Sequence, residues 1–553
     1  MRRVPSSVQV AAKSWLAVAE DQVPSYNNLM PPAFLWLLAL VATLIVGSPL
    51  PGFAQSGLLR VGLPALPTEL DPATALEGSV PLIARQVFDT LVQYADGSSD
   101  VEPALAVQWS VSKDGLVWSF RLRNGVSFHD GTPLSSQHVV DSLAREIFSG
   151  HPQAPGGDGV AARLLRGTPG VVREVRAKDP RTVEIALSQP YAPLLSVLAH
   201  PAFSVVLLAA SGEGGNRWQG TGPFSIAEIG AGRIALEAKP GHWDHGPRLA
   251  RIVLVEAADN TQAEAALSAQ SLDVLFPAGA PPRLSGAVSV PSWRIGYLAL
   301  QTEKPPFNRV KARRAVGAAL DTGRITSALG QAAVPLQTFL PRGVWSRREG
   351  PMLMGADPER AKRWLAEAGL PAGTSATLFF ADAGLRIDQP KLAEAIRASL
   401  SAAGITVTIQ AEPPETARSL VQAGEHQMTL AEAGIEAGDP HFLLYPLSTS
   451  EGAAKGASAV NFAFYRNARL DDLLIRASQL FFRPERQRLY FRAQALLAEE
   501  LPWIPIYVRL HWAVARPEVR DLRLHPSGNP RLDRVWLESE PAAPAPSDPD
   551  LAR

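Results

Sequence analysis

The segment LVWSFRLR at residues 116–123 alternates large apolar side chains with small or charged ones. A period of two is typical of a β-strand with one buried face and one face in water. The expected buried face carries Trp118, Phe120 and Leu122. Tight turns are indicated by three dipeptides, Asp114-Gly115, Asn124-Gly125 and Asp130-Gly131. We therefore expect a stack of antiparallel strands over 101–135, followed by a helix over 135–147.

The rest of the chain alternates strand-like and helix-like stretches. Short apolar stretches predict strands at 58–66, 175–187, 233–239 and 252–256, and residues 260–275 read as a helix followed by a strand. Helical patterns occupy 313–329, 390–403, 415–423 and 468–500. This alternation predicts an α/β fold with some antiparallel sheet.

One helix start is marked with particular clarity. Asp357 suits the N-cap position and Pro358 the first helical position, while Gly369 suits the end of the helix. The apolar face expected between them consists of Ala361, Trp364, Leu365 and Ala368.

Length and charge limit the function. A chain of 553 residues is too long for one ordinary core, so two or three domains are expected. Its 53 basic residues balance its 53 acidic ones, whereas a nucleic-acid partner normally requires a basic surplus. We expect no nucleic-acid partner.

The sequence contains no cysteine. Disulfides, thiolate metal sites and cysteine nucleophiles are excluded together. A lipid-modified cysteine is excluded too, so an exported form would not be lipid-anchored.

Residues 1–54 are interpreted as an export signal with an unusually long leader. The apolar run Ala33 to Val46 has 14 residues, fewer than the roughly 20 that span a bilayer. The small residues Gly52 and Ala54 suit cleavage before Gln55. An uncleaved anchor or a buried helix is the alternative, and translation could begin at Met1 or Met30. At the other end, residues 539–553 are too poor in apolar side chains to fold.

Motifs for catalysis are not found. The sequence has no phosphate-binding loop with a lysine, no Rossmann fingerprint after a strand, and no G-x-S-x-G elbow. His242 and His245 have a spacing that could suit a metal, but the segment KPGHWDHGP reads as a turn. We expect no catalytic residue, no metal site and no cofactor.

Several segments, in order, resemble one known family. The most specific is EPALAVQWSVSKDGLVWSFRLRNGVSFHDGTPLSSQHVVDSL, residues 102–143; the others are ELDP at 69–72, GTGPF at 220–224, HWDHGPRLARIVL at 242–254, YLALQTEKPPFNRVKARRAVGAALDTGRI at 297–325, DPERAKRWLAEAGLP at 357–371 and ELPWIPIYVRLHWAV at 500–514. Together they are similar to the dipeptide, oligopeptide and nickel-binding family of solute-binding proteins of ABC importers. One departure is Gln301, where the family usually has Asn.

The resemblance implies two lobes joined by crossing strands, with an extra domain inserted in the first lobe. The implied parts are lobe I at 55–75, 205–296 and 508–538, the inserted domain at 76–204, and lobe II at 297–507. Ligand would lie between the lobes and be enclosed when the hinge closes.

The same resemblance implies a ligand site. Peptide-binding members hold the ligand ammonium with a carboxylate from a loop that here reads EAGIEAGDP, residues 432–440. Glu436 falls on that position, and Ala433 replaces the usual aromatic, which implies a wider pocket. The expected ligand-binding residues are Gly434, Ile435, Glu436, Asp439, Pro67 and Thr68. Alternatively, Glu436 is a solvated loop residue or caps a helix through 442–444.

The partner of a ligand carboxylate stays open among Arg313, Arg314 and His441. Of these, Arg313 suits a structural role at its helix start.

The implied function is a periplasmic, soluble and monomeric receptor that takes peptides to a membrane permease pair driven by two ATPases. The alternatives are another solute, such as a sugar oligomer, an opine-like conjugate or a chelated metal, and an exported hydrolase.

Overall fold

The computed structural model describes residues 57–538 apart from 75–77, 156–163, 166–170, 209–217, 231, 278, 280–283, 285, 351–354 and 382–386. The chain divides into two units, Met1–Ala54 and Gln55–Arg553, and every described residue lies in the second. The predicted signal at 1–54 and the predicted tail at 539–553 therefore lie outside the described residues.

In the described part of the chain, one sheet of eleven strands organises the fold. Its path runs β10 (Phe224–Gly230), β11 (Arg233–Ala238), β12 (Arg251–Glu256), β1 (Leu58–Leu63), β13 (Val274–Leu275), β19 (Trp503–Ala515), β14 (Ala287–Leu300), β18 (Met428–Gly434), β16 (Thr374–Ala381) and β17 (Ile405–Glu412). The eleventh strand, β15 (Ala333–Pro335), pairs with β19. The sheet thus places strands of predicted lobe I on one side of β19 and β14, and strands of predicted lobe II on the other.

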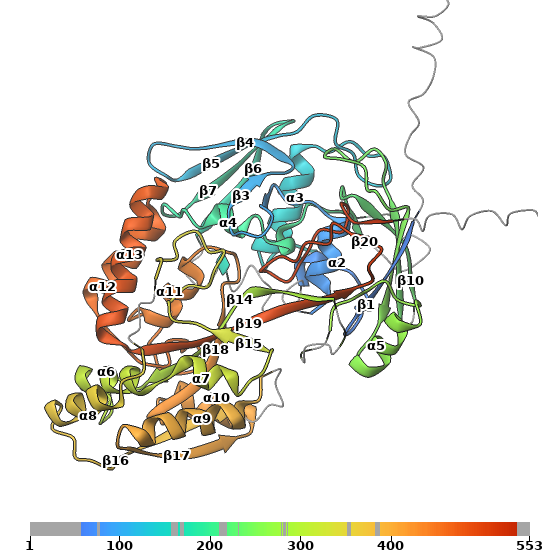
Figure 1. Cartoon of the computed structure of the whole chain (residues 1–553). Helices are drawn as coiled ribbons and strands as arrows, with labels where there is room; N and C mark the ends of the chain where they lie inside the picture. The colour runs from blue at the N-terminus through green and yellow to red at the C-terminus, as the bar shows by residue number, and fades with distance from the viewer. Residues whose placement is uncertain are drawn as a thin grey trace, which may run out of the picture. The chain divides into compact units, whose positions relative to one another are not determined.

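The two longest strands, β14 and β19, join these halves (Figure 1). They are antiparallel neighbours from Ala287↔Val514 to Ala299↔Trp503. The predicted lobe boundaries at 296 and 507 fall inside these strands, which is where crossing strands would pass from one lobe to the other. The boundaries themselves stay predictions.

A separate four-stranded antiparallel sheet lies within the predicted inserted domain. Its order is β4 (Ala106–Val111), β5 (Val117–Leu122), β7 (Thr182–Leu187) and β6 (Val172–Asp179). The period-two pattern is confirmed, because Trp118, Phe120 and Leu122 are all buried while Arg121 is exposed. Gly115, Gly125 and Gly131 have φ of 74°, 71° and 92°, the left-handed conformation that their turns require.

The remaining strands are short and pair as β2 (Val92–Tyr94) with β3 (Val101–Pro103), β8 (Leu207–Leu208) with β9 (Trp218–Gln219), and β20 (Val519–Arg520) with β21 (Trp536–Leu537). The helices are α2 (Val80–Val87), α3 (Ser136–Ile147), α4 (Leu194–Val197), α5 (Asn260–Ser268), α6 (Val310–Ala319), α7 (Thr322–Ser327), α8 (Pro358–Glu367), α9 (Gln389–Ala402), α10 (Pro414–Gln422), α11 (His441–Ser448), α12 (Ala468–Gln479) and α13 (Arg483–Glu500). Among the described residues, no helix is both long enough and apolar enough to cross a membrane.

Local signals predicted some helix boundaries well and others poorly. Asp357 caps α8 by accepting from the backbone N–H of Arg360 at 2.8 Å, as predicted. The single helix predicted over 313–329 is wrong: Leu320 is extended, and Asp321 starts a new helix by accepting from Arg324 N at 2.9 Å. The stretch 468–500 likewise contains two helices, separated at 480–482.

Two apolar cores do not follow the predicted domains strictly. Helix α2 lies in residues assigned to the inserted domain, yet Leu82, Ile83 and Val87 pack in the same core as β1, β11 and β12 of lobe I. The core of the inserted sheet, in turn, is continuous with that of lobe II. The ring of Trp118 meets Phe481, which lies between α12 and α13, at 5.4 Å.

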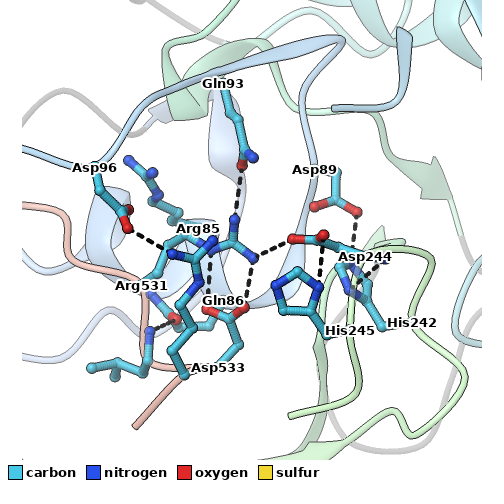
Figure 2. Close-up of polar contacts among 12 residues, drawn as sticks. Arg85, Gln86, Asp89, Gln93, Asp96, His242, Asp244, His245, Arg531 and Asp533 are labelled. Carbon is cyan, nitrogen blue, oxygen red and sulfur yellow. Dashed lines mark hydrogen bonds and ion pairs between the residues drawn. The ribbon is translucent and has the colours of Figure 1, made fainter. Parts of the chain in front are cut away.

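A polar network joins three distant segments of the chain (Figure 2). Asp89, just after α2, accepts from Trp243 Nε1 at 2.8 Å and from Thr221 Oγ1 at 2.9 Å. Burial alone would raise the pKa of Asp89, but hydrogen bonds from His242, Trp243 and Thr221 bring it below its ordinary value. This carboxylate ties the start of the predicted inserted domain to lobe I.

The C-terminal segment joins the same network. Arg531 pairs with Asp244 at 3.0 Å and with Asp533 (Figure 2). Arg85 of α2 donates to the backbone oxygen of Tyr94 at 3.3 Å. His245 contacts Asp244 at 2.8 Å, whereas His242 faces Asp89. The two histidines therefore point to different carboxylates.

Two buried histidines, His426 and His441, and the partly buried His129 have backbone carbonyl or aromatic neighbours. His129 contacts the carbonyl of Gly222, His426 contacts that of Phe462, and His441 packs against the ring of Tyr191. Burial lowers the pKa of each to about 4. All three are therefore neutral in the folded protein at neutral pH.

We expect the protein to lose stability as the pH falls from 7 to 5. In the unfolded chain a histidine takes up a proton below about pH 6.5, whereas these three in the folded protein do so only near pH 4. Between these two pH values the unfolded state binds more protons, and this shifts the equilibrium toward unfolding. Each histidine should cost on the order of 2 kcal/mol at pH 5. Urea denaturation at pH 7.5 and 5 measures the loss. His441→Gln should reduce the pH dependence and His245→Gln, at an exposed site, should keep it; equal slopes in all three proteins would contradict the argument.

Candidate ligand-binding cleft

A cavity of about 540 Å³ lies where the crossing strands meet the loops of lobe I. We call it the cleft. It is bordered by residues 63–65, 292–294, 434–436 and 509–512, and residues 524–530 form one wall. Its size is within the roughly 300–1,000 Å³ typical of small-molecule sites.

The contact that Tyr507 makes with Glu432, a lining residue of the cleft, depends on one glycine. Gly296 of β14 is paired with Glu432 of β18 on one side and with Tyr507 of β19 on the other. A β-carbon at Gly296 would lie only 2.0 Å from the Tyr507 ring. Because that space is empty, the ring crosses β14 and its hydroxyl donates to Glu432 Oε1 at 2.9 Å.

Glu432 also holds an arginine. Arg509 Nη1 donates to Glu432 Oε2 at 3.0 Å, and both side chains are largely buried, at 18% and 14% exposure. Burial raises the pKa of Tyr507 well above its ordinary value, and the charge of Glu432 adds to this effect. Tyr507 is therefore a stable hydrogen-bond donor, and the carboxylate of Glu432 is neutralised within the protein.

A β-bulge directs two further side chains. The register of β14 with β19 shifts between Pro291 and Ile295, and bulges of this kind re-aim side chains beside functional sites. Within the shift, Trp293 N donates to Pro526 O at 2.9 Å, and Ile435 N donates to Trp293 O at 2.9 Å. Trp293 and Arg294 both line the cleft.

Aromatic rings form one side of the cleft. Tyr94 and Trp293 meet edge to face at 5.2 Å, and His525 lies 5.3 Å from Trp293. Burial lowers the pKa of His525 to about 3, with the charge of Arg85 adding to this effect. Its Nε2 faces the carbonyls of Ser98 and Ala95 at 3.1 and 3.2 Å, so the neutral ring carries its proton there. Trp293 Nε1 is buried and has no hydrogen-bond partner among the described residues.

Three of the six predicted ligand-binding residues line the cleft. Gly434, Ile435 and Glu436 follow one another at its edge, where β18 ends. Glu436 is partly buried. Their ligand contacts stay predictions.

The other three lie elsewhere. Pro67 and Thr68 follow β1 but are not among the residues that line the cleft. Asp439 is 1% exposed, and both its carboxylate oxygens contact Arg486, at 2.9 and 3.0 Å. It also accepts from Tyr490 at 3.2 Å. This carboxylate faces α13 and is compensated within the protein.

The predicted carboxylate partners also lie outside the lining. Arg313 donates to Glu500 O at 2.7 Å and to Phe307 O at 3.0 Å, the contacts of a structural residue. Arg314 donates to Glu499 O at 2.6 Å. The guanidinium groups that line the described cleft belong instead to Arg294 and Arg509.

The sequence interpretation did not find Glu432, Tyr507, Arg294 or Arg509. Three of them lie in segments quoted for the family resemblance, Glu432 in EAGIEAGDP and both Tyr507 and Arg509 in ELPWIPIYVRLHWAV. The useful signal would have been the polar alternation Tyr507–Arg509–His511 in an otherwise apolar strand. Alternation of this kind places all three side chains on one face.

Gly296→Ala should destabilise the protein by about 1–3 kcal/mol, because the new methyl group overlaps the Tyr507 ring. Chemical denaturation measures the loss. Gly150→Ala is the matched control, since a β-carbon there has no atom within 4 Å, and it should change stability by less than about 0.5 kcal/mol. Equal effects of the two substitutions would show that the ring does not need this space.

The comparisons with known proteins all point to one family. Residues 100–455 match the family described as bacterial extracellular solute-binding proteins, family 5 (middle). Heme-binding protein A of Haemophilus influenzae is 30% identical over 84% of this chain and 89% of its own. The dipeptide-binding protein of Escherichia coli K12 is 27% identical over 83% of this chain and 90% of its own.

Solved structures agree on the fold. HbpA2 from Haemophilus parasuis superimposes with a TM-score of 0.80 at 24% identity, covering 87% of this chain and 100% of that one. DppA from Helicobacter pylori, in complex with the peptide STSA, gives 0.67 at 25% identity, covering 87% and 98%. The predicted two-lobed periplasmic-binding-protein fold is confirmed. The chain belongs to family 5 of the bacterial extracellular solute-binding proteins.

Proposed function

We propose that this protein is the periplasmic receptor of an ABC importer and that it binds short peptides in the cleft. The observation that carries the proposal is a cleft at the crossing strands, lined by both carboxylates and guanidinium groups. Its partners are then a permease pair and two ATPases. The receptor acts as a monomer, binds without catalysis, and is not lipid-anchored because it has no cysteine.

Several relatives support a peptide ligand. They include di/tripeptide-binding protein 2 of Pseudomonas aeruginosa, 29% identical over 88% of this chain. A dipeptide-binding protein from Pseudoalteromonas was solved with Met-Leu, and DppA with STSA. Heme is the second candidate, because the heme-binding protein A of Haemophilus influenzae is 30% identical.

The charges of the cleft suit a zwitterion. A ligand ammonium taken out of water requires a carboxylate partner, since an unpaired buried charge is very costly. Glu436 provides that carboxylate at the edge of the cleft. Glu432 is less suitable, because Arg509 and Tyr507 already occupy both of its oxygens.

Closure of the two lobes follows from the strand connections. In the described part of the main sheet, β14 and β19 carry the connection between the two halves. Small changes of backbone angle along two strands can rotate one lobe against the other. Enclosing the ligand removes water and strengthens each charge contact.

Glu436→Ala should weaken binding of trialanine at least tenfold, because the ligand ammonium loses its carboxylate. Isothermal titration calorimetry measures the change, with hemin as a second probe. Glu349→Ala is the control, since Glu349 is 92% exposed and does not line the cleft; it should bind as the unchanged protein does. Unaltered trialanine affinity in Glu436→Ala would remove Glu436 from the site, and tight hemin binding without any peptide binding would favour heme as the ligand.

Ligand binding should also make the protein more compact. Small-angle X-ray scattering of the mature protein, with and without saturating trialanine, should show a smaller radius of gyration in the bound state. The forward scattering should give the mass of one chain. Identical dimensions in the two states would contradict lobe closure.

A further inference from the structure

A turn of the predicted inserted domain lies between two sides of the cleft. It consists of residues 95–100, between β2 and β3. These residues are not among those that line the described cleft, although the preceding Tyr94 is. Turns usually run over the surface of a protein, yet Ser99 in this one is only 1% exposed. Other segments of the chain therefore cover it.

One side of the turn is attached to predicted lobe I. The neutral ring of His525 donates from Nε2 to the carbonyls of Ser98 and Ala95, at 3.1 and 3.2 Å. Asp96 pairs with Arg534 at 2.7 Å. Because His525 lies in the wall at 524–530, these contacts join the turn to that wall.

The other side of the turn is attached to predicted lobe II. Ser99 N donates to Gly343 O at 2.9 Å, and Trp345 N donates to Ser99 Oγ at 3.3 Å. Asp100 forms an ion pair with Arg483 at the start of α13. Exposed ion pairs contribute little, whereas a buried hydrogen bond is costly to lose. Ser99 is therefore the main attachment on this side.

The turn also packs against residues 434–438, which we call the cleft loop. A β-carbon at Gly438 would lie 3.2 Å from Ser99 Cβ and 3.2 Å from Tyr94 Cε1. It would lie 3.0 Å from Cη2 of Trp293, which belongs to β14. Gly438 has a φ of 69°, a conformation that residues with a side chain adopt at a cost. Glycine at this position lets the loop fit between the turn and β14.

The fit of Gly438 affects the lining of the cleft, because the loop is short. Its first three residues, Gly434, Ile435 and Glu436, line the cleft. Gly438 N donates to Ile435 O at 3.2 Å, and Ala437 between them is fully buried. A displacement of Gly438 therefore displaces the lining residues as well.

We propose that the turn at 95–100 is a spacer that fixes the separation between the wall at 524–530 and the cleft loop. Ser99 is then a positioning residue, which acts on the site through Gly438. The predicted inserted domain contributes to ligand affinity in this way, although the turn itself does not line the cleft. The inference rests on the proposed peptide-receptor function and gives the inserted domain a role in it.

Gly438→Ala should weaken trialanine binding by about tenfold or more, because the added methyl group pushes the cleft loop away from the turn. Gly404→Ala is the matched control. Gly404 has a φ of 84°, and a β-carbon there has no atom within 4 Å, so this variant carries a similar backbone cost without the contact. It should bind within about twofold of the unchanged protein. Isothermal titration calorimetry measures both, and equal affinities of the two variants would overturn the inference.

A double-mutant cycle tests the part played by the turn. Ser99→Gly removes the β-carbon that Gly438→Ala would meet. In the Ser99→Gly background, Gly438→Ala should therefore reduce trialanine affinity by a factor about threefold smaller than in the unchanged protein. The same factor in both backgrounds would show that Ser99 does not position the loop. Thermal unfolding of each variant identifies a temperature at which all of them are folded, and the titrations are made there.

Hydrogen exchange of the ligand-free protein tests the spacer without any ligand. Amides of residues 434–438 should exchange at least about fivefold faster in Gly438→Ala than in Gly404→Ala, because the displaced loop opens more often. Equal exchange would overturn the inference and leave the peptide-receptor function standing. If the unchanged protein binds no trialanine, the proposed function is wrong, and the exchange rates alone decide whether the turn positions the loop.

Discussion

The pairing of β14 with β19 is the contact on which the rest of the structure depends. These strands run antiparallel through the middle of the main sheet, and the strands of each lobe join on either side of them. The same pair supplies part of the cleft, because Arg294 comes from β14 and Arg509 from β19, and Tyr507 of β19 donates to the lining residue Glu432. One interaction therefore links the lobes and also positions the side chains between them.

Within that pair, empty space is as important as contact. Gly296 lets the Tyr507 ring cross a strand, and at Gly434 of the neighbouring β18 a β-carbon would lie 3.2 Å from Glu436 Oε1. The bulge before Ile295 takes Trp293 and Arg294 out of the β14–β19 ladder, while Arg294 stays paired with Gly434 of β18. A regular strand with a side chain at every position could not bring these groups together, because successive residues would point to opposite faces.

Sequence patterns over a few neighbouring residues correctly predicted the features that depend only on those neighbours. The alternation around Trp118 and the cap at Asp357 depend on neighbouring residues only, and both agree with the structure. The break at Asp321 was missed because the apolar pattern continues through it. Strands β14 and β19 carry mostly apolar runs with no clean period, so their crossing role came from the family resemblance rather than from pattern.

The cleft likewise contains one residue that a local motif predicted and others that only the tertiary structure brings together. Glu436 was predicted because a loop of the family could be aligned to residues 432–440, whereas Arg294, Glu432 and Arg509 come to the same cleft only through the strand register. That register brings together residues far apart in sequence, and no local rule predicts it. The assignment of α2 to the inserted domain failed to anticipate its packing for the same reason, since its apolar face is completed by β1, β11 and β12.

The position of β19 has a consequence for how the molecule is made. This strand belongs to the last part of the chain, yet it occupies the centre of the sheet between β13 and β14. The wall at 524–530 follows it, and Arg531 then anchors that wall to Asp244. A nascent polypeptide consequently lacks a complete cleft until residues 503–530 have been synthesised, so products that stop before them cannot compete for solute.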